Sequence, residues 1–393
     1  MNKIINIFSL PFFTNKKYIT TIWCLIAIVS SLKQFSSGNP YKYNNYLIYK
    51  NVFFHSINKL SLFSAYPIEY YDHNYYGPLF GVLIAPFALM PDWLGMILWC
   101  LFSTVFLIWA INKLPLKEDK INLILWICAH EFLTSILSFQ FNVLLTGLIL
   151  LSFAFILEKK EFWAALFIIV GIYVKLYGIV GLAFFFFSKN KLKFILSLLF
   201  WAIILFVLPM LISSPEFIIA AYKEWFGRLI VKNTENITLN SMQDISIMGI
   251  FRKIFHNPNI PNTPFLIFGI LLFGATYIKI KFYFQKHFQL LLLSSVLIFT
   301  VIFSSSSESP TYIIAFLGVA VWFVIQPRPY SKTTLILFIF ALLITSFSPS
   351  DIIPEFFREN FIKPYALKAL PCVLIWFKII YEILAIKKKP LIA

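Results

Sequence analysis

The sequence predicts an all-α polytopic membrane protein, a bundle of about 12 transmembrane helices, and three observations support this fold class. The chain is 60% hydrophobic and 13% charged, whereas soluble domains are about 45–50% apolar and about 25% charged. Apolar runs recur from end to end, and a helix needs about 20 apolar residues to cross a bilayer. Basic residues gather in short clusters between these runs. We therefore expect residues 1–393 to form a single integral membrane domain.

The apolar runs place the expected spans in order along the chain. Several are shorter than the ~17 residues usually needed to cross, so we allow for a thinned bilayer or broken helices. The first run follows two lysines, and no small-residue cleavage site comes after it, so we expect an uncleaved first helix. The expected spans are 18–34, 93–112, 121–139, 142–157, 162–174, 177–188, 194–213, 264–279, 287–304, 310–326, 333–348 and 366–386.

The basic clusters set the orientation. With the N-terminus in the cytoplasm, every cluster falls on the cytoplasmic side, as expected in the cytoplasmic (inner) membrane. This assignment requires the segment 78–90 to lie as an interfacial helix on the outer surface, because a crossing there would reverse everything downstream. The extracytoplasmic side then receives a first outer loop, 35–92, and a large outer loop, 214–263. The clusters are Lys16 and Lys17; Lys113, Lys117 and Lys120; Lys159 and Lys160; Lys189, Lys191 and Lys193; Lys279, Lys281 and Lys286; Arg328 and Lys332; and Lys387 to Lys389.

The net charge and the cysteines exclude several other classes of protein. The charge is +16, but the lysines form no continuous basic face, so nucleic acid is not an expected partner. The four cysteines fall inside apolar runs with no paired spacing, which indicates neither a disulfide framework nor a zinc site. No spacing of ligand residues demands a metal, and we expect no cofactor.

The first outer loop carries the stretch "PIEYYDHNYYGPLFGVLIAPFALMP", in which acids and tyrosines precede an apolar segment. Glu69 and Asp72 are three residues apart, so a helical turn would place them on one side, and either could act as a general base. Tyr75 and Tyr76 offer stacking surfaces of the kind sugar rings favour, or anchor the loop at the membrane interface. The simpler alternative is that Glu69 and Asp72 are ordinary solvent-exposed acids of a loop. Upstream, the spacing of apolar residues in 44–60 predicts a second surface-lying helix.

Polar residues at two hairpin tips could bind an anion. Lys175 lies between two short apolar runs and could meet a lipid-linked phosphate, or extend to the interface as a snorkelling lysine. Gln140 and Asn142, at the preceding tip, could donate hydrogen bonds to a phosphate or sugar, or could cap helix ends.

The remaining candidates lie in the large outer loop and near two spans. Gln243, Asp244 and Arg252 offer an acid and a fork-shaped phosphate ligand, although Arg252 could equally bind anionic lipid. Glu308 could bind a ligand or favour a helix N-terminus. The adjacent His130 and Glu131 could relay protons or form a structural hydrogen bond.

The order of several motifs resembles glycosyltransferase family 87. The stretches "NYLIY" and "YYGPLF" stand where that family carries an Asp-aromatic-x-x-Tyr helix start and a Tyr-Pro-Pro-Leu-like segment. The stretch "FQFN" is similar to its Gly-Gln-x-Asn tip, and "VKLYG" to its Leu-Lys-x-Tyr, which adds Tyr177 to the candidates. The stretch "NSMQDISIMGIFRK" resembles a later Asn-Gln-Ser…Gly…Arg element. Together these motifs cover roughly residues 20 to 255.

The resemblance implies a GT-C fold with interfacial helices in the first outer loop and an active site at the extracytoplasmic surface. It implies transfer of a sugar, with mannose as the expected one, from a polyprenyl-phosphate donor to a glycolipid or glycan acceptor. The aspartate that is the family's expected base falls on Asn45, and an amide cannot accept a proton from a hydroxyl at neutral pH. Either Asp72 has taken that role or the chain is not an active transferase, and we expect the former.

The expected mechanism is a single inverting displacement. Asp72 deprotonates the acceptor, while Lys175, Gln140 and Arg252 stabilise the departing phosphate. The residues expected to bind substrate are Asn45, Glu69, Tyr75, Tyr76, Asn142, Tyr177, Gln243, Asp244 and Glu308.

Two alternatives stay open at this point. A transporter of lipid-linked sugars would use Lys175 and the His130–Glu131 pair for coupling, but no paired inverted repeats are evident. An envelope scaffold that keeps the fold without catalysis would explain Asn45.

Overall fold

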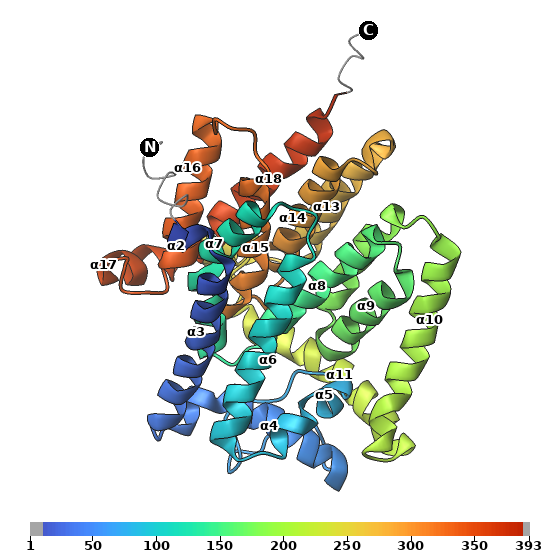
Figure 1. Cartoon of the computed structure of the whole chain (residues 1–393). Coiled ribbons are helices and arrows are strands. Elements are labelled where there is room, and N and C mark those ends of the chain that lie inside the picture. Colours follow the sequence, from blue (N-terminus) through green and yellow to red (C-terminus); the bar gives the residue numbers. More distant parts are fainter. Residues whose placement is uncertain (1–10, 388–393) are drawn as a thin grey trace. The chain divides into compact units, whose positions relative to one another are not determined.

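The computed structural model describes residues 11–387, and this part of the chain is helical with no strand (Figure 1). The chain divides into two compact units, one ending at Glu235 and the other beginning at Asn236. Within the described residues, the predicted all-α class is confirmed. The single integral membrane domain stays a prediction.

The first unit contains most of the residues that the sequence singled out. Its core buries apolar side chains from α3, α6, α7 and α8, and α8 packs against both α6 and α9. Its helices are α2 (Pro11–Thr14), α3 (Lys16–Ser36), η1 (Pro40–Tyr43), α4 (Asn44–Asn58), α5 (Leu79–Ala88), α6 (Asp92–Asn112), α7 (Glu118–Leu137), α8 (Asn142–Leu157), α9 (Glu161–Lys175), η2 (Tyr177–Phe187), α10 (Lys191–Val207), η3 (Leu208–Leu211) and α11 (Pro215–Asn236), whose last residue begins the second unit.

The second unit is built around α14 and α15, which pack against each other and against α18. Almost every residue of α14 and α15 is buried. Its helices are α12 (Ile247–Ile254), α13 (Thr263–Ala275), η4 (Thr276–Ile278), η5 (Ile280–Phe282), α14 (Lys286–Ile302), η6 (Ser309–Thr311), α15 (Tyr312–Val324), α16 (Lys332–Phe340), η7 (Ala341–Phe347), α17 (Glu355–Phe357), η8 (Arg358–Ile362), η9 (Leu367–Ala369) and α18 (Leu370–Ala385).

Each of the expected spans coincides with helical structure, but the helices differ in length. Four are long and apolar enough to cross a membrane: Lys16–Ser36, Asp92–Asn112, Glu118–Leu137 and Lys191–Leu211. Most of the other expected spans coincide with shorter apolar helices. The membrane character is therefore supported, while the count of about 12 crossings stays a prediction.

The α9–η2 hairpin shows how one pair of short spans is built. Leu176, between the two helices, has a φ of 30° and forms the turn. η2 is a 3₁₀ helix of 11 residues, longer than such helices usually run. Its Gly178 lies against α9 so closely that an added Cβ would be 2.4 Å from the Gly171 backbone. The predicted break in this pair of spans thus takes the form of a tight hairpin with a 3₁₀ return.

The apolar segment 78–90 forms α5, a short helix that packs against α4. Near its start, Gly81 lies against Ser56 of α4, and near its end the Phe87 carbonyl accepts a hydrogen bond of 3.0 Å from the Tyr46 hydroxyl of the same helix. Its 10 residues span only ~15 Å, half of a hydrocarbon core of ~30 Å. The helices predicted at 78–90 and 44–60 are confirmed as α5 and α4, while the non-crossing path of α5 stays a prediction. Their position on the outer surface stays a prediction.

Polar loops and basic clusters lie at opposite ends of the first unit. The first outer loop, the α7–α8 and α9–η2 turns and α11 contact one another at the end where α4 and α5 lie (Figure 1). At the other end, Glu158 accepts from Lys113 at 3.5 Å and from Lys160 at 2.6 Å. Which end faces the cytoplasm stays a prediction. Lys388 and Lys389 of the last cluster lie outside the described residues.

Candidate functional site

Lys175 and the two hairpin-tip amides form one cluster in the first unit. The Lys175 ammonium donates to Asn142 Oδ1 at 2.8 Å, and Asn142 Nδ2 donates to Gln140 Oε1 at 3.1 Å. Both amide side chains are buried. The ammonium also lies 5.7 Å from the ring centroid of Tyr76 and 5.5 Å from that of Tyr177. The structure thus brings together five residues that the sequence singled out from three separate segments.

The α7–α8 turn and Tyr49 hold this cluster in place. Phe139 has a φ of 52°, which ends α7 sharply and starts α8 at Asn142. The buried Tyr49 hydroxyl accepts from the Phe141 amide at 3.2 Å and donates to the Tyr76 hydroxyl at 2.9 Å. Tyr49 therefore joins α4 to the α7–α8 turn and to Tyr76 of the first outer loop. The candidate residues did not include Tyr49, although it is the last residue of the "NYLIY" stretch on which the family resemblance rests.

Asp72 lies exposed in the first outer loop, and hydrogen bonds to one of its two carboxylate oxygens orient the side chain. Its backbone has a φ of 81°, and its Oδ1 accepts from the His73 amide at 2.8 Å and from the Tyr75 hydroxyl at 3.0 Å. Among residues 11–387, Oδ2 accepts no hydrogen bond. One oxygen of the carboxylate is thus held by the loop while the other faces away from these donors.

Tyr75 connects Asp72 to α11. Its hydroxyl accepts from Arg228 at 3.0 Å, and Arg228 also pairs with Glu235 at 3.1 Å. The backbone carbonyl of Tyr75 accepts from the Trp225 indole at 2.9 Å. Burial and the Asp72 charge raise the pKa of the Tyr75 hydroxyl, against the opposing contact with Arg228. The hydroxyl therefore stays protonated and can donate to Asp72. None of these α11 residues was predicted, since no spacing links them to the loop.

A direct backbone contact ties the Asp72 loop to the end of α9. The Gly77 amide donates to the Val174 carbonyl at 3.1 Å, next to Lys175. A Cβ at position 77 would lie 2.1 Å from the Tyr173 carbonyl oxygen, so only glycine fits there. The loop that carries Asp72 and the helix end that carries Lys175 are consequently joined through one short segment.

Two asparagines at the start of α4 hold the segments that precede the candidate residues. Asn44 accepts from the Tyr71 amide at 2.7 Å and donates to the Tyr71 carbonyl, directly before Asp72. Asn45 donates to the Ser138 carbonyl at 2.8 Å, just before Gln140. A carboxylate at position 45 could not make this hydrogen bond, because an ionised acid has no donor. The amide at Asn45 thus has a structural reason to be there.

Glu69 lies apart from Asp72 in its contacts. Its carboxylate is 2.7 Å from Nε2 of His55, whose ring is buried and lies 4.1 Å from that of Tyr66. The segment between α4 and α5 contains turns and no helix, so the expected helical turn does not form. Glu69 and Asp72 are therefore not paired on one helical face, and only Asp72 is bonded to Tyr75.

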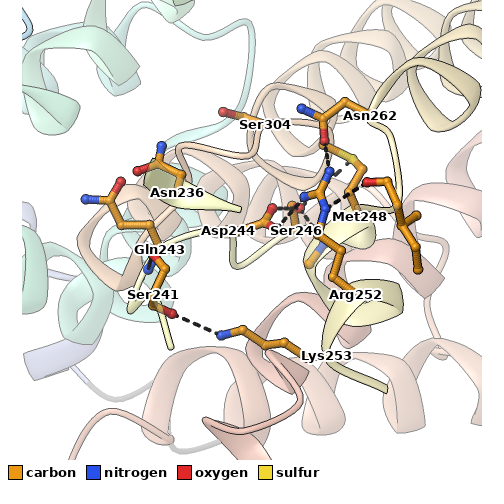
Figure 2. Close-up of polar contacts among 12 residues, drawn as sticks. Asn236, Ser241, Gln243, Asp244, Ser246, Met248, Arg252, Lys253, Asn262 and Ser304 are labelled. Atoms are coloured by element: carbon orange, nitrogen blue, oxygen red, sulfur yellow. Dashed lines mark hydrogen bonds and ion pairs between the residues drawn. The ribbon is translucent and has the colours of Figure 1, made fainter. Parts of the chain in front are cut away.

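In the second unit, Asp244 and Arg252 form a buried ion pair of 2.5 Å (Figure 2). Arg252 also donates from Nε to the Ile260 carbonyl at 2.9 Å and contacts Asn262. Asp244 accepts from the Ser246 hydroxyl at 2.7 Å, and burial raises the pKa of its carboxyl despite Ser246 and Arg252. This geometry favours a structural role for Arg252, closing the 244–262 loop, over the expected phosphate contact.

Gln243 and Glu308 lie in the two segments around this ion pair. The backbone N–H of Gln243 donates to Ser241 Oγ at 3.1 Å, and Glu308 forms a capping box with Thr311 at the start of η6. The Ser307 carbonyl next to Glu308 accepts from the Ile245 amide at 2.9 Å. Glu308 therefore has the helix N-terminal role that was the alternative to ligand binding. The segment that carries Glu308 also contacts the loop that carries Asp244.

His130 and Glu131 lie on α7, where Glu131 is fully buried and His130 is half-buried. Adjacent positions on a helix do not face each other. The geometry of α7 therefore does not by itself bring the two side chains together.

Comparison with known proteins identifies the family. The sequence model described as glycosyltransferase family 87 matches residues 74–349, well over half of the chain. The matched range contains Gln140, Asn142 and Lys175, and it begins just after Asp72. No curated protein gave a significant match to the chain. The resemblance seen in the motifs is confirmed, and the chain belongs to glycosyltransferase family 87.

Proposed function

We propose that this protein is a membrane glycosyltransferase that moves a sugar, with mannose as the first candidate, from a polyprenyl-phosphate donor to an extracytoplasmic glycolipid or glycan acceptor. The family supports glycosyl transfer. The observation that carries the finer proposal is the Lys175–Asn142–Gln140 cluster, joined to the Asp72 loop by the Gly77–Val174 contact. A cation and a carboxylate on two connected segments are what this reaction requires.

The donor phosphate would bind where α9 ends and α8 begins. Lys175 supplies the positive charge, and Asn142 and Gln140 supply amide donors beside it. α8 begins at Asn142 without a side-chain cap, and a helix N-terminus favours an anion through its backbone amides and its dipole. Charge-assisted hydrogen bonds to phosphate are stronger than neutral ones. Lys175 and the start of α8 therefore act on the same anion.

Asp72 would act as the general base toward the acceptor. The hydroxyl oxygen of the acceptor attacks the anomeric carbon, its proton passes to Oδ2 of Asp72, and the bond from the anomeric carbon to the phosphate oxygen breaks. The departing phosphate keeps the electron pair, and Lys175 stabilises its charge. Tyr75 and His73 hold Oδ1, which leaves Oδ2 for the proton. Attack from the face opposite the phosphate inverts the anomeric centre.

The inactive scaffold is the main rival proposal, and it rests on Asn45. Because Asn45 donates to the Ser138 carbonyl, its amide has a structural explanation that requires no loss of catalysis. The transporter proposal rests on Lys175 and on His130 with Glu131. The contact of Lys175 with the start of α8 suits a fixed phosphate-binding site as well as it suits a coupling residue of a transporter.

The test is transfer of labelled mannose from polyprenyl-phosphate mannose by the purified full chain, with wild type compared with Asp72→Asn. We expect Asp72→Asn to lower the rate by about 10²–10⁴-fold, the usual contribution of a general base. Asp119→Asn is the matched control, since Asp119 is an exposed acid in the first turn of α7, at the other end of the first unit. It should keep wild-type activity.

Activity that survives Asp72→Asn would refute the choice of base. Absence of wild-type transfer with mannose and with other lipid-linked sugars would favour the scaffold or the transporter.

A further inference from the structure

Three cationic side chains are buried in the second unit, although a buried charge ordinarily has a partner of opposite charge. Arg252, Lys253 and Lys368 are 1%, 8% and 4% exposed. In the part of this unit that the structure describes, Asp244 is the only buried acid. Buried positive charge therefore exceeds buried negative charge.

Hydrogen bonds and packing join the segments that carry these cations. The Lys368 ammonium donates to Ser309 Oγ at 2.9 Å and lies 5.1 Å from the ring centroid of Tyr312. The Tyr312 hydroxyl donates to the Ile245 carbonyl at 2.8 Å, in the loop that carries Asp244. α12, which carries Arg252 and Lys253, also packs against η9, which carries Lys368. The cations thus belong to one connected region.

The charges of this region do not balance even when the half-buried Glu308, next to Ser309, is included. Arg252 takes up Asp244 in an ion pair of 2.5 Å. Glu308 is then the one further acid for two lysines. The remaining positive charge is assigned to Lys253, because its contacts are the fewest.

Lys253 has one hydrogen-bond acceptor among residues 11–387, the Ser241 carbonyl at 3.2 Å (Figure 2). A lysine ammonium carries three N–H donors, so two of them have no acceptor in this part of the chain. Burial lowers the pKa of Lys253, against the opposing effect of the Asp244 charge. An anion beside the ammonium would accept the remaining hydrogen bonds and stabilise the charged form.

The side chains of α12 are arranged as they would be beside lipid. An amphipathic helix in a membrane interface turns its apolar side chains to the lipid. α12 buries Arg252 and Lys253 inside the unit and exposes three large apolar side chains: Phe251 at 41%, Ile254 at 48% and Phe255 at 66%. Lipid around the exposed face would bring its head groups close to the two cations.

The Lys253 ammonium lies beneath a surface loop. Its acceptor belongs to Ser241, which is half-buried, and the next residue, Met242, is 73% exposed. A ligand therefore has to displace only the loop around Ser241, and not the packed helices α14 and α15, to reach Lys253.

A phosphate group fits these requirements. Its oxygens accept charge-assisted hydrogen bonds from more than one N–H at a time, and basic residues at a membrane surface attract anionic lipid head groups. Free phosphate offers the same oxygens, so the chemistry is shared by two sources.

We propose that Lys253 is the centre of a phosphate-binding site in the second unit, filled by the phosphate of an anionic lipid head group or by free phosphate. The bound phosphate supplies the missing negative charge and holds the Ser241 loop on α12. This site is separate from the proposed donor site, because Lys175 belongs to the first unit. It does not depend on sugar transfer.

The test counts lipids bound to the purified full chain by native mass spectrometry. We expect the wild type to bind phosphatidylglycerol at least ~10-fold more tightly than phosphatidylcholine, whose choline cation offsets the phosphate charge. Lys253→Gln should weaken the binding of phosphatidylglycerol by about 10–100-fold, as loss of a charged hydrogen bond implies. Lys253→Arg keeps the charge and should retain part of the affinity. Lys281→Gln, an exposed lysine of η5 in the same unit, is the matched control and should bind as the wild type does.

Inorganic phosphate distinguishes the two sources. If inorganic phosphate binds at Lys253 and displaces phosphatidylglycerol, free phosphate is a ligand of the site. If phosphatidylglycerol stays bound, the lipid head group is the ligand. Either result supports the site when Lys253→Gln abolishes the binding. The ligand should also raise the unfolding temperature of the wild type and of Lys281→Gln, but not that of Lys253→Gln.

A wild-type experiment covers the case in which Lys253→Gln does not fold. Phosphatidylglycerol with a photoreactive head group should label peptides within residues 238–255, and labelling confined to other segments would overturn the site. Equal affinity of the wild type and Lys253→Gln for both phosphate and lipid would also overturn it. Lys175→Ala should bind phosphatidylglycerol like the wild type, so that loss of the donor site and loss of this site are told apart.

Discussion

Asn44 is the residue that fixes the backbone in front of Asp72. Its side-chain amide accepts a hydrogen bond from the Tyr71 N–H and donates one to the Tyr71 carbonyl, as a neighbouring β-strand would. Each such hydrogen bond contributes ~1 kcal/mol net. Loss of both would free Asp72 from its left-handed conformation, in which Oδ1 meets Tyr75.

We predict that Asn44→Ala lowers kcat by about tenfold and leaves KM for the donor unchanged, since Lys175 is untouched. Steady-state kinetics over a range of pH would check this, with Asn51→Ala as control. Asn51 lies on the same helix, and within residues 11–387 its side chain bonds only to the Leu47 carbonyl, 3.1 Å away. An equal loss in both variants would show that α4 stability, and not the placement of Asp72, was measured.

Lys175 should act on the donor and not on the acceptor. We predict that Lys175→Ala weakens inhibition by polyprenyl phosphate by ~10–100-fold, as loss of a charged hydrogen bond of ~1.5–3 kcal/mol implies. Lys175→Arg should retain part of the affinity, because it keeps the charge. Lys193→Ala, an exposed lysine in the first turn of α10, should have no effect. Unchanged inhibition in Lys175→Ala would place the phosphate elsewhere.

The sequence indicated the residues whose chemistry is unusual for their setting, and it missed those that matter through packing. A lysine between two apolar runs and an acid among tyrosines are visible in any linear reading. Tyr49 and Arg228 are not, because their partners lie 92 and 153 positions away in the chain. Arg252 shows the converse, since only the fold reveals that its guanidinium is already bound to Asp244.

At the level of elements, the α9–η2 hairpin depends on two facing glycines. We predict that Gly178→Ala destabilises the protein by about 1–3 kcal/mol, the usual cost of overpacking, because its Cβ would lie 2.4 Å from the Gly171 backbone. Thermal unfolding in detergent would measure this loss.

Gly227→Ala serves as the control in the same unit. Gly227 lies inside α11 with no atom within 4 Å of an added Cβ, so alanine there should stabilise the helix by about 0.5–1 kcal/mol. Equal stability of the two variants would mean that η2 does not require the close approach.

The positions of the helices could be predicted well from the sequence, but whether each helix is α or 3₁₀, and whether it crosses the membrane, could not. Apolar runs mark where a chain leaves water, and each run proved helical. The 3₁₀ helix η2 and the short helix α5 depend on contacts with α9 and α4, which hydropathy does not encode. The number of crossings is undetermined by hydropathy for the same reason, since several helices are shorter than a bilayer is thick.

For the whole molecule, the decisive prediction is the side of the membrane on which Asp72 lies. We expect a membrane-impermeant thiol reagent added to intact cells to label Ile68→Cys, a fully exposed position of the first outer loop. Lys117→Cys, exposed at the opposite end of the first unit, should react only after the membrane is permeabilised. The native Cys100, Cys128 and Cys372 are buried, and Cys24 would be replaced by serine to remove the background. The reverse labelling pattern would place the candidate site in the cytoplasm.

The contact between Gly77 and Val174 has a consequence for the order of events during turnover. Because the Gly77 amide is hydrogen-bonded to Val174 at the helix end that carries Lys175, a backbone shift of that helix end would be passed to the loop that carries Asp72. A donor that shifts the backbone at Lys175 would therefore also act on the placement of the carboxylate. We therefore expect the acceptor to bind productively only after the donor is in place, so that an empty enzyme does not hold an acceptor hydroxyl poised against water.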